Sequence, residues 1–246
     1  MGRGRDEIAQ LENVPLADQA REAILTAILE KRFREKLPSE DALADMLNVS
    51  RTTIRTALQR LEQDGIITRK RAIGTTINAH VRPSTLALQR MVGFDGLLRE
   101  QGYSVDVAIN WKRGTPSAEL AAAFGLEPDQ DSLLTEKAYS ADGVLAIYIR
   151  DVVPWSNLRD PEFDGEVPAS IFTFSDRDWR RPVDHVVAEI IPMVRGSDGS
   201  TKLRVRRGRP YTRLLERHFA SSGDPLAVSM VDVDNDVFHF EVFRRR

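Results

Sequence analysis

A turn of only two residues, 48–49, separates two short helical patterns, and this spacing limits how the chain can fold. The patterns cover residues 39–47 and 50–63, and each opens on a serine that can accept a hydrogen bond from the first turn of its helix. Apolar residues recur at helical spacing over 16–33, which predicts a longer helix before them. Two short β-rich segments with a glycine between them follow at 66–77. Helix, helix, turn, helix and hairpin in this order predict a winged helix-turn-helix.

The helix at 50–63 carries apolar and basic side chains on different faces. One face holds the residues expected to pack on the other helices: Ile54, Ala57, Leu58 and Leu61. Arg51 and Arg55 stand four residues apart and therefore share another face. An arginine side chain can donate two hydrogen bonds to guanine in the major groove or clamp a phosphate. The pattern indicates a DNA recognition helix.

Local charge supports this hypothesis, although the whole chain has a formal net charge of only −2. Six lysines and arginines lie between residues 50 and 71, against two acidic residues. Basic charge gathered on one segment is typical of a surface that faces a duplex. A solvated helix face is the alternative interpretation, and the serine cap, the tight turn and the basic hairpin argue against it.

The second half of the chain has a different, strand-rich pattern. Seven β-type segments are predicted, at 105–111, 133–139, 144–153, 185–191, 211–219, 226–233 and 238–243. Helical patterns lie between them at 91–101 and 117–124. We therefore expect an N-terminal arm at 1–14, a winged helix-turn-helix domain at 15–80, a linker at 81–87 and an α+β domain at 88–246. Pro83 supports the linker, because proline interrupts regular structure.

This second half also contains a weak internal repeat. At an offset of 81 residues, Leu133-Leu134, Leu145-Ala146 and Asp151-Val152 match Leu214-Leu215, Leu226-Ala227 and Asp232-Val233. Each copy has the pattern strand, short turn, strand. The repeat predicts two similar hairpins in one sheet, while the alternative is that unrelated hairpins simply resemble one another.

Several N-terminal motifs resemble the signature of the GntR family of bacterial regulators: Leu37-Pro38-Ser39-Glu40, Leu47 through Arg55, Asp64-Gly65 and Gly74-Thr75. The resemblance covers roughly residues 15 to 78. It implies a homodimer that binds a short palindromic DNA operator. The DNA contacts that we expect are Ser39, Glu40, Ser50, Arg51, Thr52, Thr53, Arg55, Arg69, Lys70, Arg71, Gly74 and Thr75. The wing departs from the usual Gly-x-Gly-Thr of the family, since Ala72 replaces the first glycine.

The C-terminal half resembles the HutC subgroup of this family, whose UTRA domain has the α+β fold of chorismate lyase with a mainly antiparallel sheet. The segments that carry this resemblance are Val92-Gly93-Phe94, Leu133 through Pro154, Ala169 through Phe172, and Val233 through Asp236. By position it implies an effector pocket formed by Phe94, Asp95, Gly96, Lys137, Tyr139, Ser170, Ser229 and Val233.

The residues at the expected pocket indicate what kind of ligand it takes. Lys137 and Tyr139 occupy the places where members that bind sugar phosphates carry two arginines, and Asp95 adds a negative charge. A monoanionic or largely neutral ligand, such as an aromatic one, is therefore expected. We expect the protein to be a repressor that this effector releases from DNA. Lys137→Ala is then expected to abolish the response to the effector while leaving operator affinity intact.

Other functions find less support in the sequence. No catalytic residue, metal site or cofactor is expected, because the four histidines lack ligand spacing and cysteine is absent. No apolar run approaches the ~20 residues of a membrane span, and a cytoplasmic location is expected. An enzyme on the lyase-like fold would have only Asp95, Lys137 and Tyr139 to work with. A ligand-independent structural DNA-binding protein is the other alternative. The basic run 202–209 is either a second nucleic-acid patch or a solvated helix end and turn.

Overall fold

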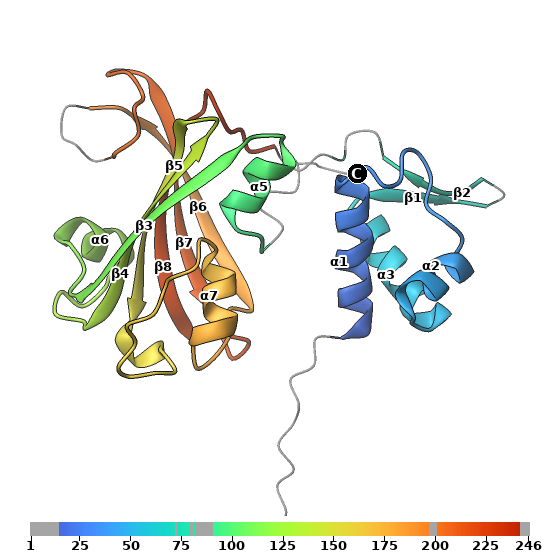
Figure 1. Cartoon of the computed structure of the whole chain (residues 1–246), viewed down its shortest axis with the longest axis horizontal. Coiled ribbons are helices and arrows are strands. Elements are labelled where there is room, and N and C mark those ends of the chain that lie inside the picture. Colours follow the sequence, from blue (N-terminus) through green and yellow to red (C-terminus); the bar gives the residue numbers. More distant parts are fainter. Residues whose placement is uncertain (1–14, 72, 79–80, 82–90, 197–200, 242–246) are drawn as a thin grey trace, which may run out of the picture. The chain divides into compact units, whose positions relative to one another are not determined.

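The computed structural model describes residues 15–71, 73–78, 81, 91–196 and 201–241 (Figure 1). The chain divides into two compact units, an N-terminal domain described from 15 to 81 and a C-terminal domain described from 91 to 241. The arm expected at 1–14 lies outside the described residues, as does the expected linker 81–87 after its first residue.

The described part of the N-terminal domain contains three helices and one antiparallel hairpin. Its elements are α1 (Leu16–Leu29), α2 (Glu40–Leu47), α3 (Arg51–Gln63), β1 (Ile67–Lys70) and β2 (Gly74–Ile77). Their order is the one predicted for a winged helix-turn-helix. The first helix ends at Leu29 and not at residue 33, because Lys31 adopts a left-handed conformation with φ of 57°. The N–H of Arg32 then donates to the carbonyl of Ala27 over 3.0 Å and closes the helix.

Local interactions explain the tight turn between α2 and α3. Asn48 has φ of 51°, a left-handed conformation that asparagine tolerates better than most residues. The N–H of Val49 donates to the carbonyl of Ala44 over 3.1 Å. Ser50 then caps α3, since its hydroxyl accepts a hydrogen bond from the N–H of Thr53 over 3.1 Å. The four apolar residues expected to pack, Ile54, Ala57, Leu58 and Leu61, are all buried, which confirms the predicted face.

The C-terminal domain is built on one six-stranded antiparallel sheet with the order β3-β4-β5-β8-β7-β6. The strands are β3 (Val105–Gly114), β4 (Ser132–Ala141), β5 (Val144–Pro154), β6 (His185–Val194), β7 (Pro210–Phe219) and β8 (Pro225–Val233). The helices are α5 (Phe94–Glu100), α6 (Ala118–Phe124), α7 (Ile171–Asp178) and the 3-10 helix η2 (Trp155–Asn157). Helices and an antiparallel sheet thus make the mixed fold that the sequence predicts.

The strand predicted at 238–243 is wrong for its described part. Residues 238–241 form no strand. The N–H groups of Val237 and Phe238 both donate to the carbonyl of Asp234, so the chain turns directly after β8. The side chain of Phe238 is fully buried against the core, and this burial explains the apolar pattern of the segment.

The sequence repeat corresponds to a local symmetry of the sheet. Hairpins β4–β5 and β7–β8 lie side by side because β5 pairs with β8. Ile149 pairs with Val231 and Arg150 with Met230. The offset of 81 residues maps Ile149 onto Met230 and Arg150 onto Val231, so a local two-fold axis passes between the two central strands. The predicted pair of similar hairpins in one sheet is confirmed.

Strand alternation gives the central strands two covered faces. On one face, Tyr139, Leu214 and Val231 form a core with α5. On the other, Val152 and Met230 pack with residues of α6. The face that carries α5 also holds the cavity described below.

Candidate functional site

The outer face of α3 carries the two arginines that the sequence singled out. Their side chains are 61% and 60% exposed for Arg51 and Arg55. Arg51 pairs with Asp41 at 2.7 Å, and Arg55 pairs with Glu40 at 3.1 Å. Both partners belong to the first turn of α2. These carboxylates hold the guanidinium groups in place while leaving most of their surface open to another molecule.

Glu40 connects three elements of this surface. One carboxylate oxygen accepts a hydrogen bond from Arg55, and the other accepts one from Arg69 of β1 over 2.6 Å. Only 22% of the Glu40 side chain is exposed. Sequence reasoning placed Glu40 among the DNA contacts. In the structure Glu40 also holds Arg55 and Arg69 in place relative to each other.

The remaining expected DNA contacts lie around these arginines. Ser39 caps α2 by accepting from the N–H of Ala42, and the Ser50 hydroxyl lies 2.8 Å from that of Thr53. Thr52, Lys70 and Arg71 are exposed, on α3 and at the end of β1, and Thr75 opposes Arg69 across the hairpin.

Gly74 has φ of 93°, a conformation that side chains rarely adopt, so the turn itself requires a glycine there. Ala72, which replaces the other glycine of the wing, lies outside the described residues.

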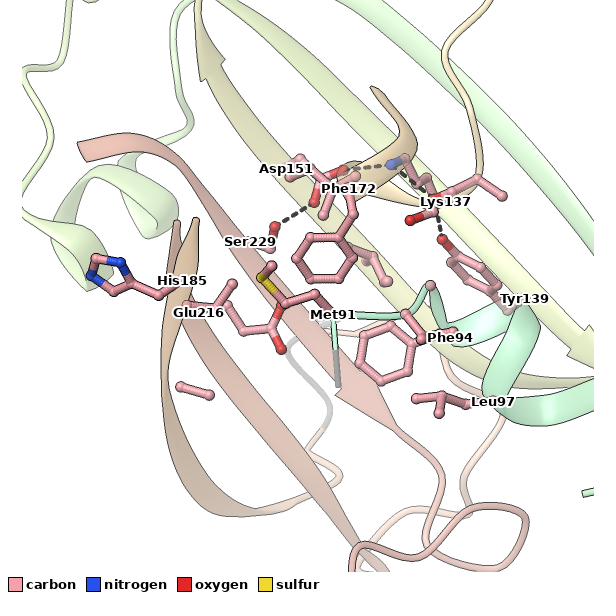
Figure 2. Close-up of a pocket in the computed structure, with 18 of the residues that line it drawn as sticks. Met91, Phe94, Leu97, Lys137, Tyr139, Asp151, Phe172, His185, Glu216 and Ser229 are labelled. Atoms are coloured by element: carbon pink, nitrogen blue, oxygen red, sulfur yellow. Dashed lines mark hydrogen bonds and ion pairs between the residues drawn. The ribbon is translucent and has the colours of Figure 1, made fainter. Parts of the chain in front are cut away.

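The C-terminal domain contains a cavity of about 370 Å³ between the sheet and the starts of α5 and α7 (Figure 2). Five of the eight residues expected to form an effector pocket line it: Phe94, Lys137, Tyr139, Ser170 and Ser229. Met91, Phe172 and His185 also line it. A cavity of this size and mixed lining can enclose a small organic molecule.

The other three expected pocket residues do not line the cavity. Asp95 lies in the first turn of α5 and pairs with Arg99 at 2.5 Å. Gly96 packs closely, since a Cβ atom there would stand 2.9 Å from the Val92 side chain. Val233 is fully buried in the core beside α5.

A buried ion pair forms one wall of the cavity. The ammonium group of Lys137 lies 3.0 Å from a carboxylate oxygen of Asp151, and both side chains are at most 2% exposed. Lys137 and Tyr139 each donate a hydrogen bond to the carbonyl of Ala169, over 3.1 and 2.6 Å (Figure 2). The positive charge that the sequence places in the pocket at Lys137 is therefore already paired with Asp151.

Hydrogen bonds complete this wall and set the protonation states of Asp151 and His218. Thr135 and Ser229 each donate to Asp151 over 2.6 Å. Burial acts to raise the pKa of Asp151, but the charge of Lys137 and these hydrogen bonds outweigh it and lower the pKa. Because the Ser229 proton is used on Asp151, Nε2 of His218 must be the donor in its 2.9 Å contact with Ser229. Burial lowers the pKa of His218 to about 4, which fits this neutral tautomer.

Glu216 is another acidic residue in the cavity wall. Its side chain is 12% exposed and receives no hydrogen bond from the described residues, and His218 lies 3.9 Å away. Burial, with a further contribution from the charge of Asp151, raises the pKa of Glu216 to about 8. The carboxyl group therefore favours its protonated, neutral form at neutral pH.

The basic run 202–209 is not a helix end. It forms irregular chain and a turn before β7, and Leu203 is buried in it. Lys202 pairs with Glu136, and Arg209 pairs with Asp236 at 3.5 Å. Within the described ranges, no cluster of histidine and acidic residues suits a metal ion, and no helix has the length and apolarity needed to cross a membrane.

Comparison with known proteins bears first on the N-terminal domain. Residues 16–77 match the family model described as bacterial regulatory proteins, gntR family. Over these residues the N-terminal domain is similar to the DNA-binding domain of that family. The helix-turn-helix, the exposed arginines and the hairpin described above all lie within the matched residues.

Relatives extend the similarity beyond the gntR domain. The HTH-type transcriptional regulator GgaR of Escherichia coli (strain K12) is 38% identical over 165 residues, which are 65% of this chain and 64% of that protein. The chain thus matches somewhat less than two thirds of GgaR. The HTH-type transcriptional repressor NagR of Bacillus subtilis (strain 168) is 23% identical over 214 residues, 85% of this chain and 86% of NagR.

A solved structure shows the same fold over both domains. The possible transcriptional regulator YydK from Bacillus subtilis subsp. subtilis str. 168 superposes with a TM-score of 0.65 at 18% identity. The match covers 94% of this chain and 100% of YydK. The fold of this chain is therefore similar to that of YydK along nearly its whole length.

Sequence reasoning missed Asp151 and Glu216, two of the three acidic residues that line the cavity. A signal for both was present. Asp151 stands two residues after Ile149, and Glu216 stands two residues after Leu214, so each continues the buried face of its strand. An acidic residue on such a face needs a partner or a function.

Proposed function

We propose that this chain is a transcriptional regulator that binds a two-fold symmetric DNA operator as a homodimer. The observation that carries the proposal is the outer face of α3, where Arg51 and Arg55 project from a helix whose other face is buried in a gntR domain. A helix of this kind fits the major groove, where arginine recognises guanine. Ser39, Ser50 and the wing would bind the flanking phosphates.

We further propose that the C-terminal domain is a UTRA-type effector domain of the HutC subgroup and that its cavity binds the effector. The cavity volume lies in the range of small-molecule sites, and it is lined by five residues that the resemblance pointed to. NagR is called a repressor, which supports the same role here. An effector that binds more tightly to a dimer whose DNA-binding domains are out of position lowers the affinity for DNA. DNA lowers the affinity for the effector by the same factor.

Removing either arginine should weaken specific DNA binding. We expect Arg51→Ala and Arg55→Ala each to cost about 1–3 kcal/mol on a duplex that the wild-type protein selects from a random-sequence library. Binding is measured across a salt series on the selected duplex and on a random one. A loss confined to the selected duplex indicates base recognition, and an equal loss on both indicates a phosphate contact.

Arg60→Ala is the matched control for these variants. Arg60 lies on the same helix, roughly 180° around from Arg51, and pairs with Asp18 of α1. Its replacement should leave DNA affinity close to that of the wild type. If both Arg51→Ala and Arg55→Ala bind the selected duplex like the wild type, α3 is not the recognition helix.

The full chain should be a dimer in solution. Two recognition helices must reach successive major grooves, about 34–36 Å apart along the duplex. Sedimentation equilibrium at micromolar concentration should therefore give twice the mass of one chain. A monomer at that concentration, both with and without the selected duplex, would contradict the homodimer.

A further inference from the structure

The charges around the cavity do not suit an anionic ligand. Of the described residues that line it, three are acidic, Asp151, Asp184 and Glu216, and the only lysine or arginine is Lys137. Lys137 is already held by Asp151 and by the carbonyl of Ala169. A ligand carboxylate would have to break the buried ion pair to reach this ammonium group, and would then leave Asp151 without its cation.

The start of α5 does not offer an anion site either. The N-cap Gly93 lines the cavity, and the first turn of the helix contains Asp95. A Cβ atom on Gly93 would stand 2.5 Å from a carboxylate oxygen of Asp95 and 2.7 Å from Cβ of Ser170. The carboxylate of Asp95 thus lies over the end of the helix where an external anion would bind.

Glu216 offers a site for a cation. Figure 2 shows its side chain in the cavity, with no dashed line to any other residue drawn. Lys137 on β4 is paired with Asp151 on β5. His218 on β7 is a neutral donor to Ser229 on β8. His185 on β6 contacts Asp184. None of these groups supplies a cation to Glu216, so the carboxyl is free to accept one from a ligand.

We propose that the effector of this cavity is a small organic cation, a protonated amine on an apolar body, whose ammonium group binds the Glu216 carboxylate. The inference rests on the proposed effector function of the C-terminal domain. Met91, Phe94 and Phe172 line the same cavity and would contact the apolar body. The rings of Phe94 and Phe172 also attract a cation through the negative potential of their faces.

Binding of such a ligand moves a proton. Without an ammonium group beside it, Glu216 is protonated at neutral pH, since burial and Asp151 raise its pKa to about 8. An ammonium group beside it favours the carboxylate, so the proton leaves Glu216 for the buffer as the ion pair forms. At pH 7 nearly one proton is released for each ligand bound, and the number falls towards zero as the pH rises above 8.

Three probes on one phenyl skeleton test the proposal: 2-phenylethylamine, 2-phenylethanol and 3-phenylpropionate. Calorimetric titration of the full chain near neutral pH should show the amine binding at least about tenfold more tightly than the alcohol, with the carboxylate weakest. Titration in two buffers of different ionisation enthalpy measures the proton release. No saturable binding of the amine up to about 10 mM, or a carboxylate that binds more tightly than the amine, overturns the proposal.

Two variants test whether Glu216 is the residue that binds the ammonium group. Glu216→Gln should lower amine affinity at least about tenfold, abolish the proton release and leave alcohol affinity within about twofold. Glu189→Gln is the matched control, because Glu189 lies exposed on the neighbouring strand β6 and does not line the cavity; it should behave like the wild type. Unchanged amine binding by Glu216→Gln contradicts the proposed site.

Operator binding by the wild type, measured in the same samples, separates this proposal from the proposed function. One outcome is that the protein binds its selected duplex and is released from it by 3-phenylpropionate but not by 2-phenylethylamine. The proposed regulatory function is then retained, and the proposal of a cationic ligand is wrong. If the protein binds no duplex specifically but binds the amine with proton release, the cationic site stands and the DNA-binding function is wrong.

Discussion

Lys137→Met should lower the free energy of unfolding of the C-terminal domain by about 3–5 kcal/mol. Methionine keeps the length of the side chain but removes the cation that lies 3.0 Å from Asp151. The carboxylate would then be buried without its partner, and the carbonyl of Ala169 would lose one of its two donors. The sequence suggested that Lys137→Ala would affect only the effector response, whereas its burial makes any neutral replacement destabilising.

Tryptophan fluorescence during urea unfolding measures this effect in the full chain, because all three tryptophans, Trp111, Trp155 and Trp179, lie in the C-terminal domain. Lys112→Met, on the exposed surface of β3, is the control and should change stability little. The double variant Lys137→Met with Asp151→Asn should recover part of the loss, since no charge remains unpaired. A loss below about 1 kcal/mol for Lys137→Met would show that the ion pair is not buried as described.

The N-terminal domain could be predicted from the sequence because its determinants are local. Ser50 caps a helix whose first turn follows it directly, and Asn48 forms the turn with its own left-handed conformation. The apolar face of α3 follows from helical spacing alone. The order of elements, their bounds within a few residues and the exposed arginines therefore all followed from reading along the chain.

The cavity could not be predicted in this way, because it is formed by strand pairings that cannot be read along the sequence. Lys137 and Asp151 meet because β4 pairs with β5, and Glu216 joins them only through the order β5-β8-β7. Strand positions were predicted well, but strand order was predicted only in part, through the repeated hairpin. The resemblance therefore located Lys137 in a pocket, while its neutralisation by Asp151 required the register between two strands.

The error at 238–243 has a related cause. Alternating Phe238, His239 and Phe240 look like a strand, but the carbonyl of Asp234 accepts two hydrogen bonds and turns the chain. Phe238 and Phe240 then pack edge to face, with ring centroids 5.1 Å apart. Apolar alternation reports burial of side chains, and only backbone pairing makes a strand.

Glu216→Gln should make the C-terminal domain more stable than the wild type at alkaline pH. In the unfolded chain Glu216 has its ordinary pKa of 4.5, and in the folded domain burial and Asp151 raise the pKa to about 8. Between these values the folded state holds a proton that the unfolded chain has released, so stability falls as the pH rises from 4.5 to 8. Glutamine removes this dependence. The difference in unfolding free energy between variant and wild type should change by on the order of 3–5 kcal/mol from about pH 5 to about pH 9.

Taking the difference between the two proteins isolates Glu216 from the other buried titrating group. His218 has its pKa lowered by burial from 6.5 to about 4, so its stabilising contribution is lost as the pH falls through that window, and it is lost equally in both proteins. Urea unfolding followed by tryptophan fluorescence at several pH values gives the two profiles. Glu189→Gln, exposed on β6, should follow the wild-type profile throughout. Parallel profiles for Glu216→Gln and the wild type would mean that Glu216 is ionised in the folded domain, and that the cavity already contains a group that stabilises its negative charge.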